Sequence, residues 1–294
     1  MILPLLFAVV ATGFRGDGLK PYRHPVMIWI SPYGVAKARV QLANPGLQRA
    51  VTHLSLQFWV PTRSGTVELI ASSGEVSVAL IDDLRSWAQA HGIRVMLCVC
   101  NAPEEWDWPL AKSAFAANRE RFAQSLVDEM TRRRLDGIDI DFEGPDHLGG
   151  DKPAYVAFIK TLAKRLHLQG KQLTLDSLAD DNSTPDRLWW PELFPFVDAL
   201  TTMGYDAIGL SGAKAAAYSA QVSAAGKYGT KLQLGVPSGW DKWLGNSSSQ
   251  QLEWIRRNGN CGIGIWDAGL QGASWRTKAL WDIVDRIRVG DTRG

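Results

Sequence analysis

The chain has 294 residues, of which 46% are hydrophobic and 21% are charged. This composition is typical of a globular protein and excludes long disordered regions, a collagen and a coiled coil. The 32 basic residues are offset by 30 acidic ones spread along the chain, so the sequence lacks the basic patch of a nucleic-acid binder and we expect no nucleic-acid partner.

The N-terminus begins with an apolar run over residues 2–11, which is too short to cross a bilayer as a helix. With small residues near Ala11 and Gly13, the run resembles the apolar part of a secretory signal, although the usual preceding positive charge is missing. We therefore expect residues 1–13 to be a secretory signal segment and the protein to be secreted or extracytoplasmic. The alternative is a buried first segment of the fold. No later stretch predicts a membrane span, so we expect no membrane partner.

Short, nearly continuous apolar runs then recur along the chain, as in parallel strands that are covered on both faces. The eight predicted strands cover residues 26–31, 54–59, 93–99, 137–141, 172–176, 199–203, 231–235 and 262–266. Amphipathic helical patterns lie between them, the clearest at residues 78–91, 115–134, 155–168 and 275–289. Eight strand–helix repeats predict an α/β fold, a single (β/α)8 TIM barrel that forms one catalytic domain over residues 14–294.

An open doubly wound sheet is the alternative fold, and it would need a glycine-rich phosphate turn after the first strand. The residues at that position, Pro32-Tyr33-Gly34-Val35, do not form one.

The cysteine count is three, and Cys98, Cys100 and Cys261 have no zinc-site spacing. We expect buried thiols, with one disulfide to Cys261 as the alternative.

The acidic pattern LDGIDIDFE, residues 135–143, is the strongest local signal in the chain. Strand geometry places Asp139, Asp141 and Glu143 on one face and the apolar residues between them on the other. In a barrel, the acids would point inward and rise toward the C-terminal ends of the strands, where active sites lie. Burial and mutual repulsion should raise the pKa of at least one of them, as a general acid near neutral pH requires. A divalent metal site is the alternative at this point, because neighbouring carboxylates can bind Mg²⁺.

This acidic strand also carries a resemblance. The residues DGIDIDFE resemble the DGxDxDxE signature of family 18 glycoside hydrolases, which include chitinases and endo-β-N-acetylglucosaminidases. Residues 202–206, TMGYD, are similar to the MxYD motif that ends the family's sixth strand. Gly235-Val236-Pro237 resembles the family's Gly-x-Pro turn after the seventh strand. Only about 60 residues separate Tyr205 from Trp266, so the resemblance is to the compact type without an inserted α+β domain, which implies an open groove and endo-cleavage.

The chain departs from the family pattern at the end of the third strand. The residues Cys98-Val99-Cys100-Asn101 stand where the family usually has Ser-x-Gly-Gly. This departure affects the support of the lower acids and leaves the catalytic acid in place.

The resemblance implies a substrate-assisted mechanism, an exception to the usual pair of catalytic carboxylates. Glu143 would protonate the glycosidic oxygen, and the 2-acetamido oxygen of the sugar would attack the anomeric carbon to give an oxazolinium ion. Asp141 would stabilise that ion through the acetamido N–H, and Asp139 would share a proton with Asp141. Tyr205 would hold the acetamido oxygen in line.

The remaining substrate-binding candidates are mainly aromatic. Trp266 is where the family has the tryptophan under the cleaved sugar, and the others are Trp29, Phe58, Trp106, Trp240, Met203 and Asp206. Each aromatic side chain could instead belong to the core or anchor a loop.

We therefore expect a retaining, endo-acting hydrolase of β-1,4-linked N-acetylglucosamine, monomeric, with no cofactor and no metal ion. An endo-β-N-acetylglucosaminidase acting on N-glycan cores and a non-catalytic chitin-binding, lectin-like barrel are the alternatives. A metal-dependent barrel enzyme is a further alternative, although none of the five histidines lies at the C-terminal end of a predicted strand.

Overall fold

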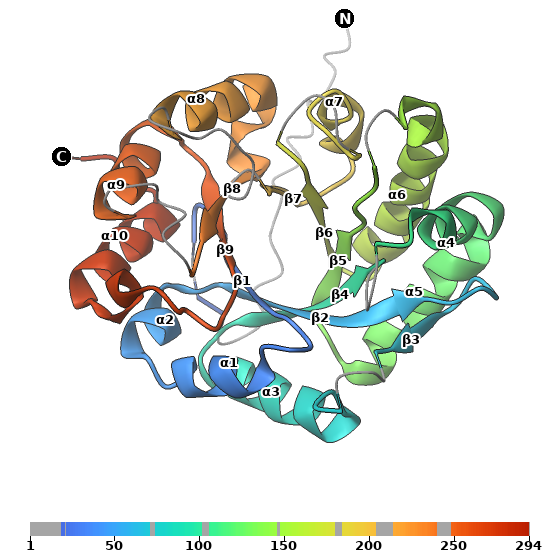
Figure 1. Cartoon of the computed structure of the whole chain (residues 1–294), viewed down its shortest axis with the longest axis horizontal. Helices are drawn as coiled ribbons and strands as arrows, with labels where there is room; N and C mark the ends of the chain where they lie inside the picture. Colours follow the sequence, from blue (N-terminus) through green and yellow to red (C-terminus); the bar gives the residue numbers. More distant parts are fainter. Residues whose placement is uncertain are drawn as a thin grey trace, which may run out of the picture.

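A computed structural model of the chain describes residues 19–20, 22–70, 74–101, 106–145, 148–179, 184–203, 214–239 and 248–293, with the backbone alone for 214–217. Eight parallel strands form a closed ring in the order β1-β2-β4-β5-β6-β7-β8-β9, and β9 pairs with β1 to close it (Figure 1). The strands are β1 (Val26–Ile30), β2 (His53–Pro61), β4 (Arg94–Cys100), β5 (Gly137–Asp141), β6 (Gln172–Ser177), β7 (Ala199–Thr202), β8 (Leu232–Pro237) and β9 (Gly262–Trp266). The predicted (β/α)8 barrel is confirmed, and all eight predicted strands are present with their ends shifted by a few residues.

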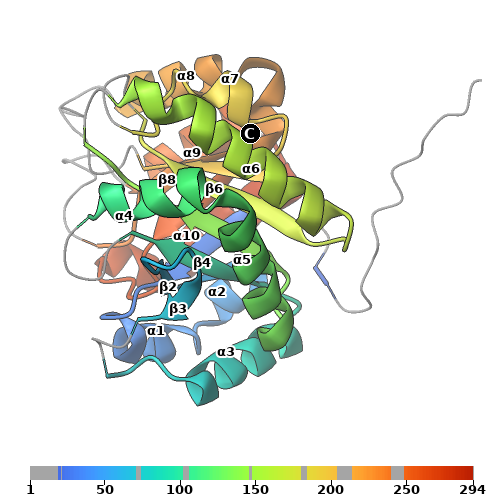
Figure 2. The same ribbon diagram turned by 90° about the vertical axis from the view of Figure 1, so that its right-hand side faces the viewer.

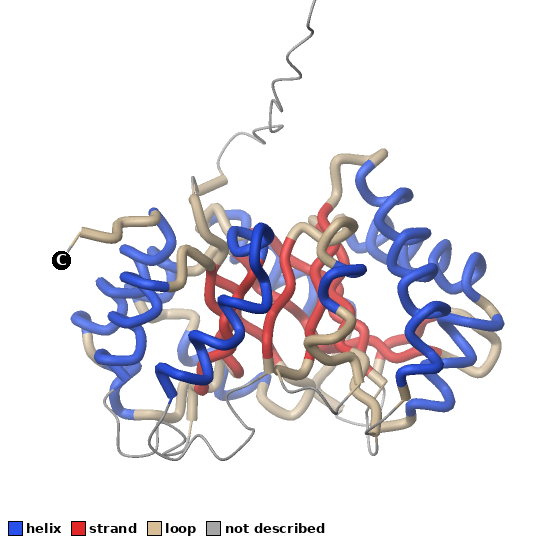
Figure 3. Tube along the Cα trace, turned by 90° about the horizontal axis from the view of Figure 1, so that it is seen from above, coloured by secondary structure: helices blue, strands red, loops and turns tan. Residues whose placement is uncertain are grey.

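Helices surround the ring of strands on its outside, as the views in Figures 2 and 3 show. The α-helices are α1 (Val35–Gln41), α2 (Pro45–Ala50), α3 (Val78–Ala90), α4 (Trp108–Lys112), α5 (Arg119–Arg133), α6 (Lys152–His167), α7 (Trp190–Leu193), α8 (Lys214–Ala225), α9 (Ser248–Asn258) and α10 (Lys278–Val289). Short helical turns lie at Ser113–Ala117, Gly149–Asp151, Gly226–Lys231 and Ala273–Arg276. The pattern over residues 115–134 is divided, because a π-helical turn precedes α5.

Local chemistry sets several helix ends. The Ser77 hydroxyl accepts a hydrogen bond from the Leu80 N–H at the start of α3, and the Thr277 hydroxyl does the same for Leu280 at the start of α10. Such caps satisfy N–H groups that the first helical turn leaves free. Helix α10 ends at Gly290, which has a φ of 71°, a left-handed conformation that glycine adopts without strain.

One strand was not predicted. Strand β3 (Val67–Leu69) pairs antiparallel with the end of β2, which extends to Pro61. The connecting turn contains Gly65 at a φ of 73°. This hairpin lies outside the barrel ring, at its edge next to β2.

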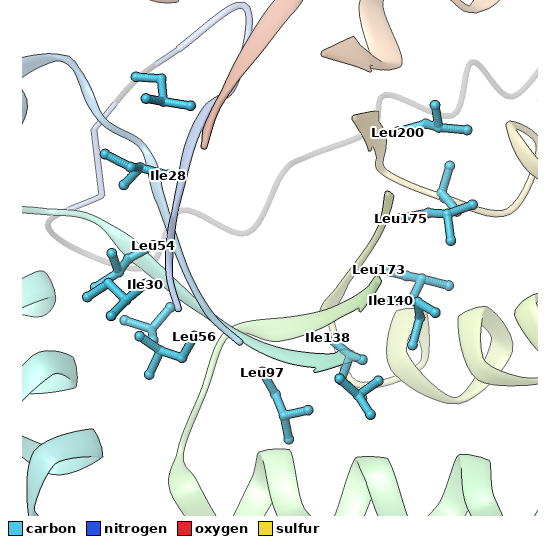
Figure 4. Close-up of a cluster of buried hydrophobic side chains, with 14 of the residues drawn as sticks. Ile28, Ile30, Leu54, Leu56, Leu97, Ile138, Ile140, Leu173, Leu175 and Leu200 are labelled. Atoms are coloured by element: carbon cyan, nitrogen blue, oxygen red, sulfur yellow. The ribbon is translucent and has the colours of Figure 1, made fainter. Parts of the chain in front are cut away.

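The two faces of the barrel sheet differ in chemistry. Aliphatic side chains point outward from the strands toward the helices, and Figure 4 shows ten of them labelled, among them Leu97, Ile138 and Ile140. These side chains form the main hydrophobic core. The barrel interior holds a much smaller apolar cluster of Met27, Trp29, Met96 and Cys98, with Trp266 against it. The inner face is therefore left for polar residues.

The three cysteines are free and buried, as expected from their spacing, so no disulfide joins Cys261 to the other two. Among the described helices, none combines the length and the apolar character needed to cross a membrane.

Candidate active site

The acidic strand β5 lies on the side of the ring opposite β1 and β9 and alternates as predicted. Asp139 and Asp141 are 0% and 3% exposed, whereas Ile138 and Ile140 belong to the outer core. Glu143 follows the end of the strand at the C-terminal rim, where it is partly exposed. The three acids therefore rise from the middle of the barrel interior to its rim.

Asp139, the lowest acid, is held by three donors from three other strands. The Trp29 indole Nε1 and the Ser55 hydroxyl both donate to its Oδ2, at 2.8 and 2.6 Å, and the Thr174 hydroxyl donates to Oδ1 at 2.6 Å. A carboxylate accepts hydrogen bonds at about four sites, and donors to it favour the ionised form. Burial nevertheless raises the pKa of Asp139, and these hydrogen bonds oppose that rise.

Asp141, the middle acid, has fewer partners. The Gln57 side chain donates to its Oδ2 at 2.6 Å, and its buried Oδ1 has no hydrogen-bond partner among the described residues. Burial raises the pKa of Asp141 to about 7, the Gln57 hydrogen bond opposes that rise, and the nearby Asp139 adds to it. Asp141 therefore changes charge near neutral pH.

Glu143 is positioned through its backbone by Asn101, the residue that follows β4. The Asn101 side chain accepts from the Glu143 N–H and donates to the Glu143 carbonyl oxygen, both at 2.8 Å. Burial, followed by the charge of Asp141, raises the pKa of Glu143 well above its usual range. A carboxyl group that keeps its proton at a partly exposed rim is suited to act as a general acid.

A fourth acid, Asp176 at the end of β6, also faces the interior and was missed in the sequence. It is 3% exposed, and one of its oxygens lies within 4.8 Å of a carboxylate oxygen of Asp139 and of the Cys98 sulfur. These three atoms are close enough to consider a metal site. However, Asp139 already accepts three hydrogen bonds, and burial raises the pKa of the Cys98 thiol well above its usual range, which disfavours the thiolate that a metal ion binds.

The two aromatic residues at the strand ends next to the acids have different roles. The rings of Trp266 and Trp29 lie 6.4 Å apart, and Trp266 is partly exposed at the rim. Trp29 is 3% exposed and donates to Asp139, so the structure shows a supporting role for it, and the sugar contact predicted from the sequence stays a prediction. Gly264 makes room for it, because a Cβ at that position would lie 2.8 Å from the Trp29 ring.

The other predicted substrate-binding residues are scattered. Phe58 is fully buried in the outer core, so the prediction that it contacts substrate is wrong. Trp106 is 48% exposed in the segment after β4, and Met203 directly follows β7. Tyr205, Asp206 and Trp240 lie outside the described residues.

The sequence also did not predict three residues that support the acids: Asn101, Gln57 and Ser55. Their roles depend on contacts between strands that are distant in sequence, and only the departure from Ser-x-Gly-Gly indicated that Asn101 stood at a sensitive position.

Together the fold and the site define a class of protein: a barrel hydrolase with a glutamate of raised pKa at the rim above two buried aspartates. The family can also be stated. The chain belongs to the glycosyl hydrolases family 18, whose family model matches residues 26–253.

Solved structures agree on the fold. A chitinase from Chromobacterium violaceum superposes with a TM-score of 0.73 at 17% identity, covering 90% of this chain and 98% of that one. A chitinase from Bacteroides thetaiotaomicron superposes with a TM-score of 0.70 at 14% identity, covering 91% and 97%.

Two curated relatives match over parts of the chain. Chitinase A1 of Niallia circulans is 26% identical over a 206-residue alignment that covers 56% of this chain and 29% of the relative. A chitinase-like effector of Moniliophthora perniciosa is 33% identical over 101 residues, 33% of this chain and 22% of the relative. The match therefore spans less than a third of the length of each curated relative.

Proposed function

We propose that this protein hydrolyses β-1,4-linked N-acetylglucosamine chains, such as chitin, by endo-cleavage with retention of anomeric configuration. The observation that carries the proposal is the ladder of acids on β5: Asp139 held by three hydrogen bonds, Asp141 with a pKa of about 7, and Glu143 at the rim with a pKa well above its usual range. A substrate-assisted mechanism uses this arrangement, with the general acid at the rim and the acid that contacts the acetamido group below it.

In the proposed reaction, the Glu143 proton goes to the glycosidic oxygen as the bond from that oxygen to the anomeric carbon breaks. The acetamido carbonyl oxygen of the same sugar bonds to the anomeric carbon and forms an oxazolinium ion. Because this nucleophile is part of the substrate, it is present at high effective molarity and no second carboxylate nucleophile is needed. Glu143, now ionised, takes a proton from water, and the resulting hydroxide opens the ion.

Asp141 stabilises the positive charge of the intermediate through the acetamido N–H. Asp139 lies beneath it, and the charge of Asp139 contributes to the raised pKa of Asp141. Tyr205 and Asp206 complete the acetamido site in this proposal, on the strength of the motif they match.

Endo-cleavage is proposed because a barrel without an inserted lid domain would present an open groove. Only ten residues, 238–247, connect β8 to α9, too few for an inserted lid domain. We also propose that the protein is a monomer and that it is secreted or extracytoplasmic, because polymeric N-acetylglucosamine occurs outside the cytoplasm.

The test is hydrolysis of an N-acetylglucosamine hexamer labelled at its reducing end, with and without a chelator. Internal cleavage products that are unaffected by the chelator support the proposal. Release of single terminal units contradicts endo-cleavage, and loss of activity with the chelator contradicts the metal-free mechanism. Binding without cleavage would favour the lectin-like alternative, and cleavage of an N-glycan core alone would favour the endo-β-N-acetylglucosaminidase.

A further inference from the structure

The fourth acid, Asp176, has a local environment that the three-acid mechanism does not explain. It ends the inward-facing row of β6, next to β5. The register between β5 and β6 pairs Ile140 with Leu175, so the next step along both strands places Asp141 and Asp176 at the same level. Neighbouring strands lie about 4.8 Å apart, which brings two aspartate side chains at the same level within reach of each other.

Both of these side chains have one unsatisfied oxygen. Oδ1 of Asp141 and Oδ1 of Asp176 are buried and have no hydrogen-bond partner among the described residues, although each residue is only 3% exposed. Buried polar atoms without partners are rare because each is costly. One proton placed between the two oxygens would satisfy both atoms at once.

Between Asp141 and Asp176, the proton belongs on Asp176. Asp139 accepts three hydrogen bonds and Asp141 accepts one from Gln57, which stabilises their charged forms. Asp176 is deeply buried next to other acids, which disfavours its ionised form. Burial, then the charges of Asp139 and Asp141, raise its pKa well above its usual range, and a hydrogen bond from Thr201 only partly opposes this.

Among the described residues, the titratable groups near Asp176 supply no compensating positive charge. Several of these groups raise the pKa of Asp176 or have their own pKa raised by its charge. They lie on β4, β5, the segment after β5 and α6, and are Cys98, Asp139, Asp141, Glu143 and Tyr155. All of them are acids, and burial keeps the Cys98 thiol and the Tyr155 hydroxyl neutral by raising the pKa of each.

We propose that Asp176 is a positioning residue of the reaction: as a neutral carboxylic acid it donates a hydrogen bond to Oδ1 of Asp141 and holds that side chain in line with the acetamido group. Gln57 holds the other oxygen of Asp141 from β2, so the carboxylate is gripped from two strands. Asp176 makes no contact with the reacting atoms. The kinetic part of this inference rests on the proposed function.

Two substitutions of similar size test whether Asp176 acts as a neutral hydrogen-bond donor. Asp176→Asn stays neutral and keeps an N–H donor, whereas Asp176→Leu stays neutral and has no donor. We expect Asp176→Leu to lose about tenfold in kcat with little change in KM, since only the orientation of Asp141 suffers. Asp176→Asn should recover most of that loss.

The pH profile provides a readout that a purely structural role would not move. A donor to the Asp141 carboxylate lowers its pKa, so removing the donor should raise it. The limb of the kcat/KM profile that reports Asp141 should therefore move to higher pH in Asp176→Leu and stay close to wild type in Asp176→Asn. An Asn variant as impaired as the Leu variant would overturn the proposal, because it would mean that Asp176 works as an anion.

The protonation state is measured separately on the substrate-free protein. The infrared difference spectrum between wild type and Asp176→Asn at pH 8, above the pKa of Asp141, should show the C=O band of a protonated carboxyl group in wild type that the variant lacks. Loss of a carboxylate band instead would overturn the proposal. An inactive wild-type protein would count against the proposed function alone, because this spectrum uses no substrate. Circular dichroism of both variants confirms that they fold.

Discussion

The same five residues of strand β5 form two faces with different functions. The outward face carries Ile138 and Ile140, which are fully buried against the helices. The inward face carries Asp139 and Asp141, which are equally buried but face other polar groups. Equal burial therefore has opposite consequences: it stabilises the aliphatic face and raises the pKa values of the acidic one. Stability and chemistry are separated by the two-residue period of a strand.

The largest effect is expected at the rim acid. Glu143→Gln removes the transferable proton while keeping the size and polarity of the side chain, so kcat should fall by about 10³-fold, within the range for general acid catalysis. Oligosaccharide binding, measured by calorimetry, should persist.

A buried glutamate outside the barrel interior is the matched control for this variant. Glu129 on α5 accepts a hydrogen bond from the Trp59 indole and pairs with Arg133. Glu129→Gln should lower the melting temperature and leave kcat within about twofold, since the change is remote from the reacting atoms. Equal losses of kcat in both variants would contradict the separation of the faces.

The next effect concerns the outer face. Ile140→Ala should reduce the free energy of unfolding by about 3 kcal/mol, because it leaves a cavity in the outer core. Urea unfolding monitored by tryptophan fluorescence measures this change. The folded variant should keep kcat within about threefold. A loss of kcat as large as that of Glu143→Gln would show that the two faces are not independent.

How far the sequence predicts this molecule depends on the range of the interactions. The alternation in β5 is local, so the inward acids, the outward aliphatic residues and the barrel itself could be predicted. The hydrogen bond from Gln57 to Asp141 spans 84 positions and that from Trp29 to Asp139 spans 110, and no local pattern carries such information.

A register shift in β2 explains the error at Phe58. Phe58 was predicted to contact substrate, but it lies at a bulge where the pairing register between Gln57 and Trp59 shifts. A register shift changes which face a residue occupies, so period-two reasoning fails there. The small helices α1, α2 and α7 have four to seven residues, which is too short for a periodic pattern to stand out.

A smaller effect is expected in the pH dependence of stability. Because the folded state raises the pKa of Asp141 from 3.8 to about 7, the folded protein binds more protons than the unfolded chain between these values. The free energy of unfolding should therefore fall as the pH rises from about 4 to about 7.

Two variants test that assignment. Asp141→Asn and Asp141→Leu both remove the titrating group, so both should flatten this part of the stability profile in urea unfolding at a series of pH values. A slope that stays unchanged in both variants would place the proton uptake on other groups.

The smallest effect is expected at the rim surface. Trp106 is 48% exposed after β4, so Trp106→Ala should leave the free energy of unfolding unchanged and raise KM about threefold through a lost aromatic contact with the sugar. Leu168, 80% exposed before β6 at the opposite end of the barrel, is the matched control. Steady-state kinetics of Leu168→Ala should match wild type, and an unchanged KM in Trp106→Ala would remove Trp106 from the binding groove.

Substrate-assisted cleavage at the acid ladder of β5 is tested most directly by the anomeric configuration of the first product. Proton NMR during cleavage of an N-acetylglucosamine tetramer distinguishes the two anomers of the newly formed reducing end before they equilibrate. The account predicts that the β-anomer appears first and that Glu143→Gln abolishes it. The α-anomer as the first product would contradict the mechanism even if hydrolysis is rapid.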